Sequence, residues 1–187
     1  MASSRSLGVL FSLLVATLMA ACGEDTGAAP PLQASAASSV GCKSGHGYQH
    51  TTLGYHLCFP DNWISRDYTA EPGSGGAVSV VALGAPSSVP THVPASGTLT
   101  PPIEIRVVAG PKDQAEVSLA RGNTVTSTTV AGIKADRIKV VDSGPANGAV
   151  IVVFERQGNT FEIEEAPGGT ADAAFQQVLD SFSFPAS

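Results

Sequence analysis

Apolar and polar residues alternate along several short segments of the chain, which is the pattern of β-strands with one buried face. Around Ile105, for example, apolar residues occupy one face, whereas Glu104 and Arg106 occupy the other. A continuous apolar run at 77–83 predicts a strand that is covered on both faces. The predicted strands lie at residues 55–59, 77–83, 103–107, 124–130, 133–141, 149–155 and 160–165.

Two further segments have the spacing of helices. Pro111 can occupy the first turn of a helix that ends before Gly122. A second helix is predicted over 171–181, with Thr170 as its N-cap. Its apolar stripe consists of Ala171, Ala174, Phe175, Val178, Leu179 and Phe182. Because amphipathic helices are the available covers for such strands, the pattern predicts an α+β fold, an antiparallel sheet covered by a few helices.

The segment 84–102 has no periodic pattern and contains five prolines. A connection of this length without secondary structure of its own is usually functional or mobile. It is therefore a candidate contact for a partner.

The N-terminus has the pattern of an export signal. Arg5 supplies a positive start, and the uncharged stretch 7–21 is too short to span a hydrocarbon core of about 30 Å comfortably. The ending Leu-Met-Ala-Ala-Cys, which finishes at Cys22, resembles the lipobox of bacterial lipoproteins, in which the Cys becomes the lipidated first residue. Met19 stands where that motif usually has Leu. The alternative is an ordinary secretory signal, which would leave Cys22 unmodified.

These features divide the chain into a lipoprotein signal peptide (1–21), Cys22 with a flexible tether (22–41) and a globular domain (42–187). The tether is rich in Ala, Ser and Pro and cannot bury enough apolar surface to fold. We expect a lipid anchor, with palmitate among its acyl chains, to hold the domain in the bacterial cell envelope. Gly23 stands where some lipoproteins carry an Asp as an inner-membrane signal, which favours the outer membrane or the cell surface.

Cys42 and Cys58 remain as an even pair once Cys22 is set aside for lipid. Export favours a disulfide between them, and closing this loop would stabilise the domain by about 3 kcal/mol. A reactive or metal-binding thiol pair is the alternative, but the spacing is far from Cys-x-x-Cys.

Three histidines close to this pair, His46, His50 and His56, are the candidate metal ligands, because imidazole binds zinc and copper. The segment 44–50 is predicted to be a loop, so the four-residue spacing of its two histidines does not place them on one face. We therefore expect solvated histidines, no metal and no cofactor.

Catalytic motifs are missing from the sequence: it has no Gly-x-Ser-x-Gly elbow and no phosphate-loop signature. Glu162 and Glu164 share the outward face of a predicted strand, about 7 Å apart, a separation that inverting glycosidases use. We expect this to be a solvated strand face, with no catalytic residues. Trp63 and Tyr68 could form a sugar-stacking platform, although a tryptophan at such a corner usually belongs to the core.

Charge narrows the possible partners. The 187 residues carry a net charge of −6, and removal of Arg5 with the signal peptide makes the remainder more acidic. Scattered basic residues on an acidic chain exclude nucleic acid as the expected partner. They also exclude electrostatic docking on anionic lipid, so that the expected contact with a membrane is the lipid anchor alone.

Four motifs give the domain a resemblance to the PsbP-like α/β/α sandwich proteins, including the DcrB-type and LpqN-type bacterial lipoproteins. They are an aromatic-Pro-x-x-Trp corner, a Val-Ala-Gly-Ile hairpin, a Gly-Asn hairpin and a helix that leads into a short last strand. They lie at residues 54–63, 130–135, 151–163 and 175–184. The Pro-rich segment and the Cys pair depart from the family pattern. The resemblance implies an accessory or interaction role without a shared catalytic site.

The sequence thus predicts a non-enzymatic, membrane-anchored envelope lipoprotein that binds a protein partner. One alternative is a small-ligand or metal-binding lipoprotein that uses His46, His50 and His56. Another is an envelope hydrolase that uses Glu162 or an unrecognised serine.

Overall fold

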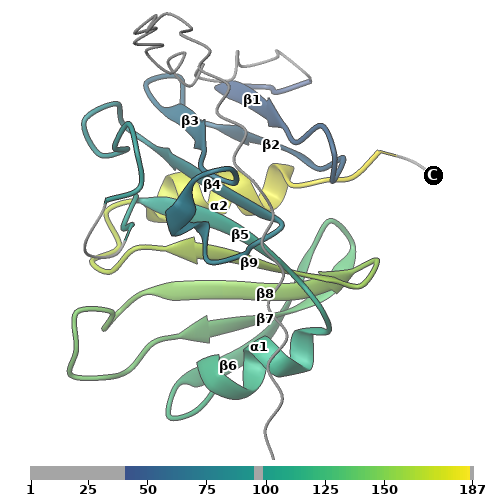
Figure 1. Ribbon diagram of the computed structural model, residues 1–187, viewed down its shortest axis with the longest axis vertical. Helices are drawn as coiled ribbons and strands as arrows, with labels where there is room; N and C mark the ends of the chain where they lie inside the picture. The colour runs from purple at the N-terminus through teal and green to yellow at the C-terminus, as the bar shows by residue number, and fades with distance from the viewer. Residues whose placement is uncertain (1–40, 95–98, 186–187) are drawn as a thin grey trace, which may run out of the picture. The chain divides into compact units, whose positions relative to one another are not determined.

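An antiparallel sheet of seven strands is the centre of the computed structural model, which describes residues 41–94 and 99–185 (Figure 1). In spatial order the strands are β3 (Ile64–Asp67), β4 (Ser79–Gly84), β5 (Ile103–Ala109), β9 (Asn159–Glu165), β8 (Val150–Arg156), β7 (Ile133–Lys139) and β6 (Thr124–Val130). The other elements are β1 (His46–Gln49), β2 (His56–Phe59), the short 3-10 helix η1 (Pro72–Ser74), α1 (Lys112–Leu119) and α2 (Asp172–Ser181).

The N-terminal features predicted above fall outside the described residues. The signal peptide, Cys22 and the tether up to residue 40 belong to this part, so the lipid anchor and the domain boundaries stay predictions. Among the described residues, no helix is long and apolar enough to cross a membrane.

Two meanders build the sheet. The strands β3, β4 and β5 form the first, and β6 to β9 form the second. The helix α1 connects them, and the second meander turns back so that β9 pairs with β5. Its first hairpin turns at Ala131 and Gly132, whose φ angles of 52° and 77° give the left-handed turn that matches strand twist.

The first face of the sheet is covered by α2 and by the β1–β2 hairpin. The predicted stripe of α2 is confirmed, because Phe175 and Val178 are fully buried in the main core. Aromatic rings dominate this core, and Tyr55 stacks on Phe182 with ring centroids 5.0 Å apart. Tyr55, Leu57 and Phe59 occupy alternate positions of the predicted strand 55–59, and all three are buried in this core.

The second face carries two smaller apolar clusters with different covers. One lies on β7 and β8 around Ile138 and Ile151, where Leu119 of α1 packs on it. The other lies on β4, where the loops around Tyr68 and Val89 cover Val80 and Ala82. Layers therefore lie on both sides of the sheet, and the predicted α+β fold is confirmed.

Two local predictions were wrong. The segment 46–49 was expected to be a loop, but it forms β1, because β2 supplies hydrogen-bond partners that the sequence alone does not reveal. Thr170 does not cap α2, whose N-cap is Ala171 with no side-chain cap. The buried Glu165 lies at the start of α2, beside Asp172 and the backbone amide of Ala171. Burial and then the neighbouring Asp172 raise the pKa of the Glu165 carboxyl to about 7.

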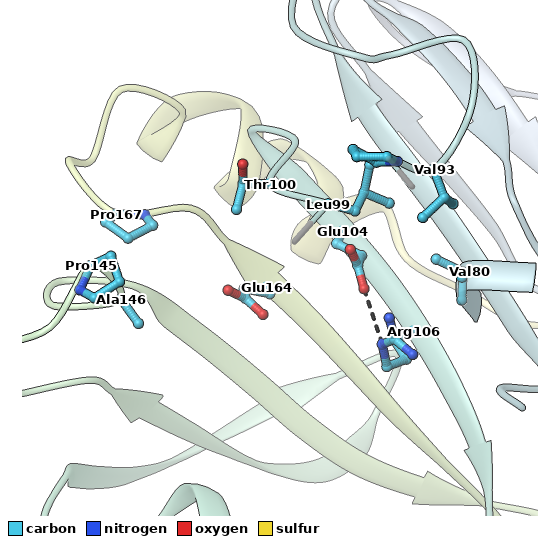
Figure 2. A pocket seen from close by; sticks show the side chains of 12 residues that line it. Val80, Val93, Leu99, Thr100, Glu104, Arg106, Pro145, Ala146, Glu164 and Pro167 are labelled. Atoms are coloured by element: carbon cyan, nitrogen blue, oxygen red, sulfur yellow. Dashed lines mark hydrogen bonds and ion pairs between the residues drawn. The ribbon is translucent and has the colours of Figure 1, made fainter. Parts of the chain in front are cut away.

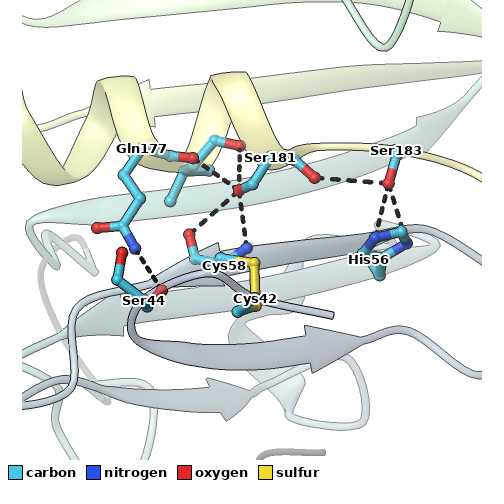
Figure 3. The surroundings of a disulfide bond; sticks show 8 residues. Cys42, Ser44, His56, Cys58, Gln177, Ser181 and Ser183 are labelled. Carbon is cyan, nitrogen blue, oxygen red and sulfur yellow. Dashed lines mark hydrogen bonds between the residues drawn. A yellow bond between two sulfur atoms is a disulfide. The ribbon is translucent and has the colours of Figure 1, made fainter. Parts of the chain in front are cut away.

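The predicted disulfide between Cys42 and Cys58 is confirmed (Figure 3). It joins the residues before β1 to β2, which is in turn fixed to α2. The Cys58 backbone N–H donates to Ser181 Oγ over 2.8 Å, and Gln177 Nε2 donates to the Ser44 carbonyl over 3.2 Å. The disulfide thus secures the hairpin that covers the first face.

Loss of this disulfide should destabilise the domain by about 3 kcal/mol, because the unfolded chain regains the entropy of an open loop. The variant C42S/C58S should show this loss in urea denaturation, and wild-type protein in reductant should match it. The variant itself should not respond to reductant. An unchanged midpoint of unfolding would mean that the contacts with α2 alone hold the hairpin.

Candidate functional site

A cavity of about 690 Å³ opens on the second face of the sheet, between its two apolar clusters (Figure 2). Its volume falls in the range of small-molecule sites. The floor consists of side chains from β4, β5 and β9, and the two walls are loops. The lining side chains of the floor are Val80, Glu104, Arg106 and Glu164.

Strand register places the charges of the floor. Glu104 on β5 lies opposite Glu164 on β9, and Arg106 lies opposite Glu162. Arg106 already has two partners, because its Nε donates to Glu104 Oε1 over 3.0 Å and its Nη1 donates to the Ser74 carbonyl over 3.0 Å. Within the described residues, no side chain donates a hydrogen bond to Glu162 or Glu164.

The carboxyl groups of Glu104, Glu162 and Glu164 all have a pKa above that of free glutamate. Burial is the main cause in each case. Arg106 opposes the rise in the pKa of all three groups. Glu104 adds to the rise for Glu162, and Glu104 and Glu162 both add to the rise for Glu164. Glu104 and Glu164 in the floor and Glu162 beside it are half-buried and share the single guanidinium of Arg106, so the floor is short of positive charge.

One wall comes from the Pro-rich segment, and Val93, Pro94, Leu99 and Thr100 line it. Polar contacts anchor the start of this wall. The Tyr68 hydroxyl and Arg66 Nη1 both donate to the Pro90 carbonyl. The Val93 backbone N–H donates to Glu71 Oε2 over 2.6 Å.

Close packing fixes the same wall. Gly73 lies against Val93, and any Cβ at residue 73 would overlap Val93 Cγ1. The part of the segment next to η1 is therefore held in place, although it has no regular secondary structure.

The opposite wall comes from the loops that follow β7 and β9. It presents Pro145, Ala146 and Pro167, and Figure 2 shows Glu164 between this wall and Glu104. Apolar walls around an acidic floor suit a ligand that combines a cationic group with an apolar body.

The expectation of a solvated face at Glu162 and Glu164 was wrong, because both side chains are half-buried. The loops that cover them come from distant parts of the chain. One feature of the sequence pointed to this site: Glu104 and Arg106 share the polar face of β5, just as Glu162 and Glu164 share that of β9. The sequence did not reveal that β5 and β9 are neighbours in the sheet.

The three candidate histidines, His46, His50 and His56, have different contacts and do not form a cluster. His46 Nε2 lies 2.9 Å from the Asp61 carbonyl. The expectation of solvated histidines was wrong for His50, which is buried and accepts the Leu53 N–H at Nδ1 over 3.1 Å. His56 contacts Ser183 near the C-terminus. In the part of the chain that the structure describes, no three His, Cys, Asp or Glu side chains are arranged to hold a metal ion.

Ser183 and His56 form a serine–histidine contact, but its geometry differs from that of an activated nucleophile. Ser183 Oγ lies 3.0 Å from Nδ1 and 2.8 Å from Nε2 of His56 (Figure 3). An oxygen nearly equidistant from both ring nitrogens is aligned with the lone pair of neither.

The two aromatic candidates for a sugar platform belong to the interior. Tyr68 is fully buried, and the partly buried Trp63 packs against the main core. Trp63 thus packs on the core, as expected, without being fully buried in it.

No protein-family model matches the sequence, and no significant match is found among curated proteins. Among solved structures the chain is similar to cyanobacterial PsbP (CyanoP) from Synechocystis sp. PCC 6803, with 15% identity and a TM-score of 0.46. The match covers 79% of this chain and 96% of that one. The PsbP-like resemblance of the sequence thus has a counterpart among structural neighbours.

A protein of Bacteroides thetaiotaomicron is similar with 12% identity and a TM-score of 0.47, over 77% of this chain and 50% of that one. At these identities and scores, neither likeness says anything of activity, ligands or partners.

The raised pKa values predict that Glu164→Gln stabilises the domain in a pH-dependent way. A raised pKa means that the folded state holds the proton longer, so stability falls as the pH rises from the unfolded value of about 4.3 through the folded pKa. The variant should therefore be more stable than wild type at pH 8, by about 0.2–1 kcal/mol, the range of a cross-strand pair such as Glu104 and Glu164, and no more stable at pH 4. Urea denaturation at both pH values measures this, with Asp61→Asn as an exposed control. Equal stability of Glu164→Gln and wild type at pH 8 would contradict the claim that the charged Glu164 destabilises the folded domain.

Proposed function

We propose that this protein is a membrane-anchored lipoprotein of the bacterial cell envelope, and that its domain is a non-catalytic binding module. The cavity on the second face of the sheet is its binding site. The ligand is a lysine or arginine side chain presented by a segment of an envelope protein partner.

The anchor rests on the N-terminal sequence. A short apolar stretch that ends in Ala-Ala-Cys at Cys22 supports lipidation, and the tether that follows supports a domain held away from the membrane surface.

The single observation that carries the binding role is the cavity, with its apolar walls and acidic floor. A lysine or arginine side chain combines an apolar stem, which suits the walls, with a cationic head, which suits the acidic floor. Its alkyl stem can lie along Val93 and Leu99, while its charged head meets Glu164. The ammonium or guanidinium group would give Glu164 a direct hydrogen-bonded partner, which Arg106 is not, because Arg106 donates to Glu104 and to the Ser74 carbonyl.

Binding is favoured over hydrolysis by the way the carboxyl groups titrate. A pair of carboxyl groups that acts as acid and base needs surroundings that move the two pKa values apart. Here burial is the largest cause for Glu104, Glu162 and Glu164 alike, and it raises the pKa of each, so none of the three is lowered. Such a group of acids is suited to hold a cation.

The anchor is tested by Cys22→Ser in the full-length protein expressed in an exporting bacterium. Wild type should fractionate with membranes and carry the added mass of acyl chains. The variant should lose both properties, because Cys22 is the proposed attachment point. Wild-type protein that is soluble, with an unmodified Cys22, would contradict lipidation.

Binding is tested by calorimetry with blocked peptides that carry one lysine between apolar residues. Replacing that lysine by norleucine should weaken binding about tenfold or more, a loss of about 1.4 kcal/mol, because the peptide then has no charge to offer the floor. Glu164→Gln should weaken binding to a similar extent, whereas Asp61→Asn should not.

Butylammonium serves as the small-amine comparison. Much weaker binding of butylammonium than of the peptide supports a protein partner, and equal binding supports a free amine as the ligand. Equal binding of the lysine and norleucine peptides would contradict the proposed role of the floor.

A further inference from the structure

The two edges of the sheet differ in how they are protected. The edge strand β3 has only four residues, among them Arg66 and Asp67, and Arg66 reaches out to the Pro-rich segment. Shortness and charge are devices that keep an edge strand from pairing with another chain. The other edge strand, β6, has none of them.

β6 is a regular and uncharged edge. Its sequence is Thr-Val-Thr-Ser-Thr-Thr-Val, which contains no proline and favours strands. All seven residues pair with β7 in unbroken register, so no bulge turns the edge away. Among the described residues, no strand pairs with its outer side.

The turn determines which backbone groups point outward. Val130 pairs with Ile133 across the two-residue turn, so these two residues form the hydrogen-bonded pair that closes the hairpin. Hydrogen-bonded pairs alternate along an antiparallel ladder. The N–H and C=O groups of Val125, Ser127 and Thr129 therefore point away from β7.

We propose that β6 pairs with β6 of a second copy of this chain, antiparallel and centred on Ser127. In this register Ser127 lies opposite Ser127 of the second copy, and Val125 lies opposite Thr129. The outward groups of these three residues then meet the same groups of the other copy, so that each N–H finds a C=O. The contact is isologous and closes after two copies.

Side chains suit this register as well. Val125 is 39% exposed, and its β-branched side chain would pack beside that of Thr129 on one face of the joined sheet. No charged residue of β6 would face its own copy, because the strand has none. The buried area of a single strand edge is small, so the dimer is weak and depends on concentration.

The test uses the mature chain, residues 22–187 with Cys22→Ser, in sedimentation equilibrium over a wide concentration range. We expect a monomer–dimer equilibrium. Ser127→Pro should abolish it, because proline removes an outward N–H without breaking the ladder with β7. Ser127→Lys should also abolish it by placing two like charges opposite each other, and this variant keeps every backbone group. Ser127→Ala is the matched control and should dimerise as wild type does.

Hydrogen exchange locates the contact. The amides of Val125, Ser127 and Thr129 should exchange quickly in dilute solution and become protected as the dimer forms. A protein that stays monomeric at every concentration overturns the proposal, including one in which these amides are protected by residues 23–40 of the same chain. A dimer that persists in both Ser127→Pro and Ser127→Lys also overturns it.

Discussion

The pairing of β5 with β9 is the contact on which the rest of the structure depends. It joins two meanders that would otherwise be separate small sheets, each with an exposed edge. It also determines what lies on the two faces. Because side chains alternate along a strand, Ile105 and Ile163 face the main core from neighbouring positions, while Glu104 and Glu164 face the other side together.

That placement has an electrostatic cost. Carboxylates on adjacent strands repel each other, and burial under the loops weakens their hydration. Arg106 offsets part of the cost through Glu104. A fold selected for stability alone would be expected to carry apolar or oppositely charged residues there. Buried, poorly compensated charge of this kind is typical of functional sites, so the acidic floor favours a ligand-binding role.

The walls turn this face into a site. Without the Pro-rich segment, the acids would lie on an open sheet surface and be hydrated. The anchors at Tyr68 and Glu71 and the close approach of Val93 to Gly73 hold the segment over the sheet. The described part of this irregular segment thus forms one side of the cavity.

Local patterns in the sequence were enough to predict most elements. Alternation and strand-length runs of strand-forming residues located every described strand except β1 and β3, the apolar stripe located α2, and the even pair of exported cysteines predicted the disulfide. What failed depended on contacts with other segments, which the pattern of a single segment does not show. The strand β1 forms because β2 lies beside it, and Glu162 and Glu164 are half-buried because of loops from elsewhere. The pairing of β5 with β9 is of this kind, because α1 and three strands intervene, so the site could not be assembled from the sequence.

The most direct measurement is a carbon-13 NMR titration of the side-chain carboxyl groups of Glu104, Glu162 and Glu164, with and without a saturating lysine peptide. In the free protein all three should titrate above the ordinary pKa of glutamate. A bound ammonium group favours the charged form, so the peptide should lower the pKa of Glu164 most clearly, because this carboxylate lies in the floor and has no hydrogen-bond donor among the described side chains. A peptide that binds while all three pKa values stay unchanged would show that the cavity floor does not recognise the cation, and would contradict the account.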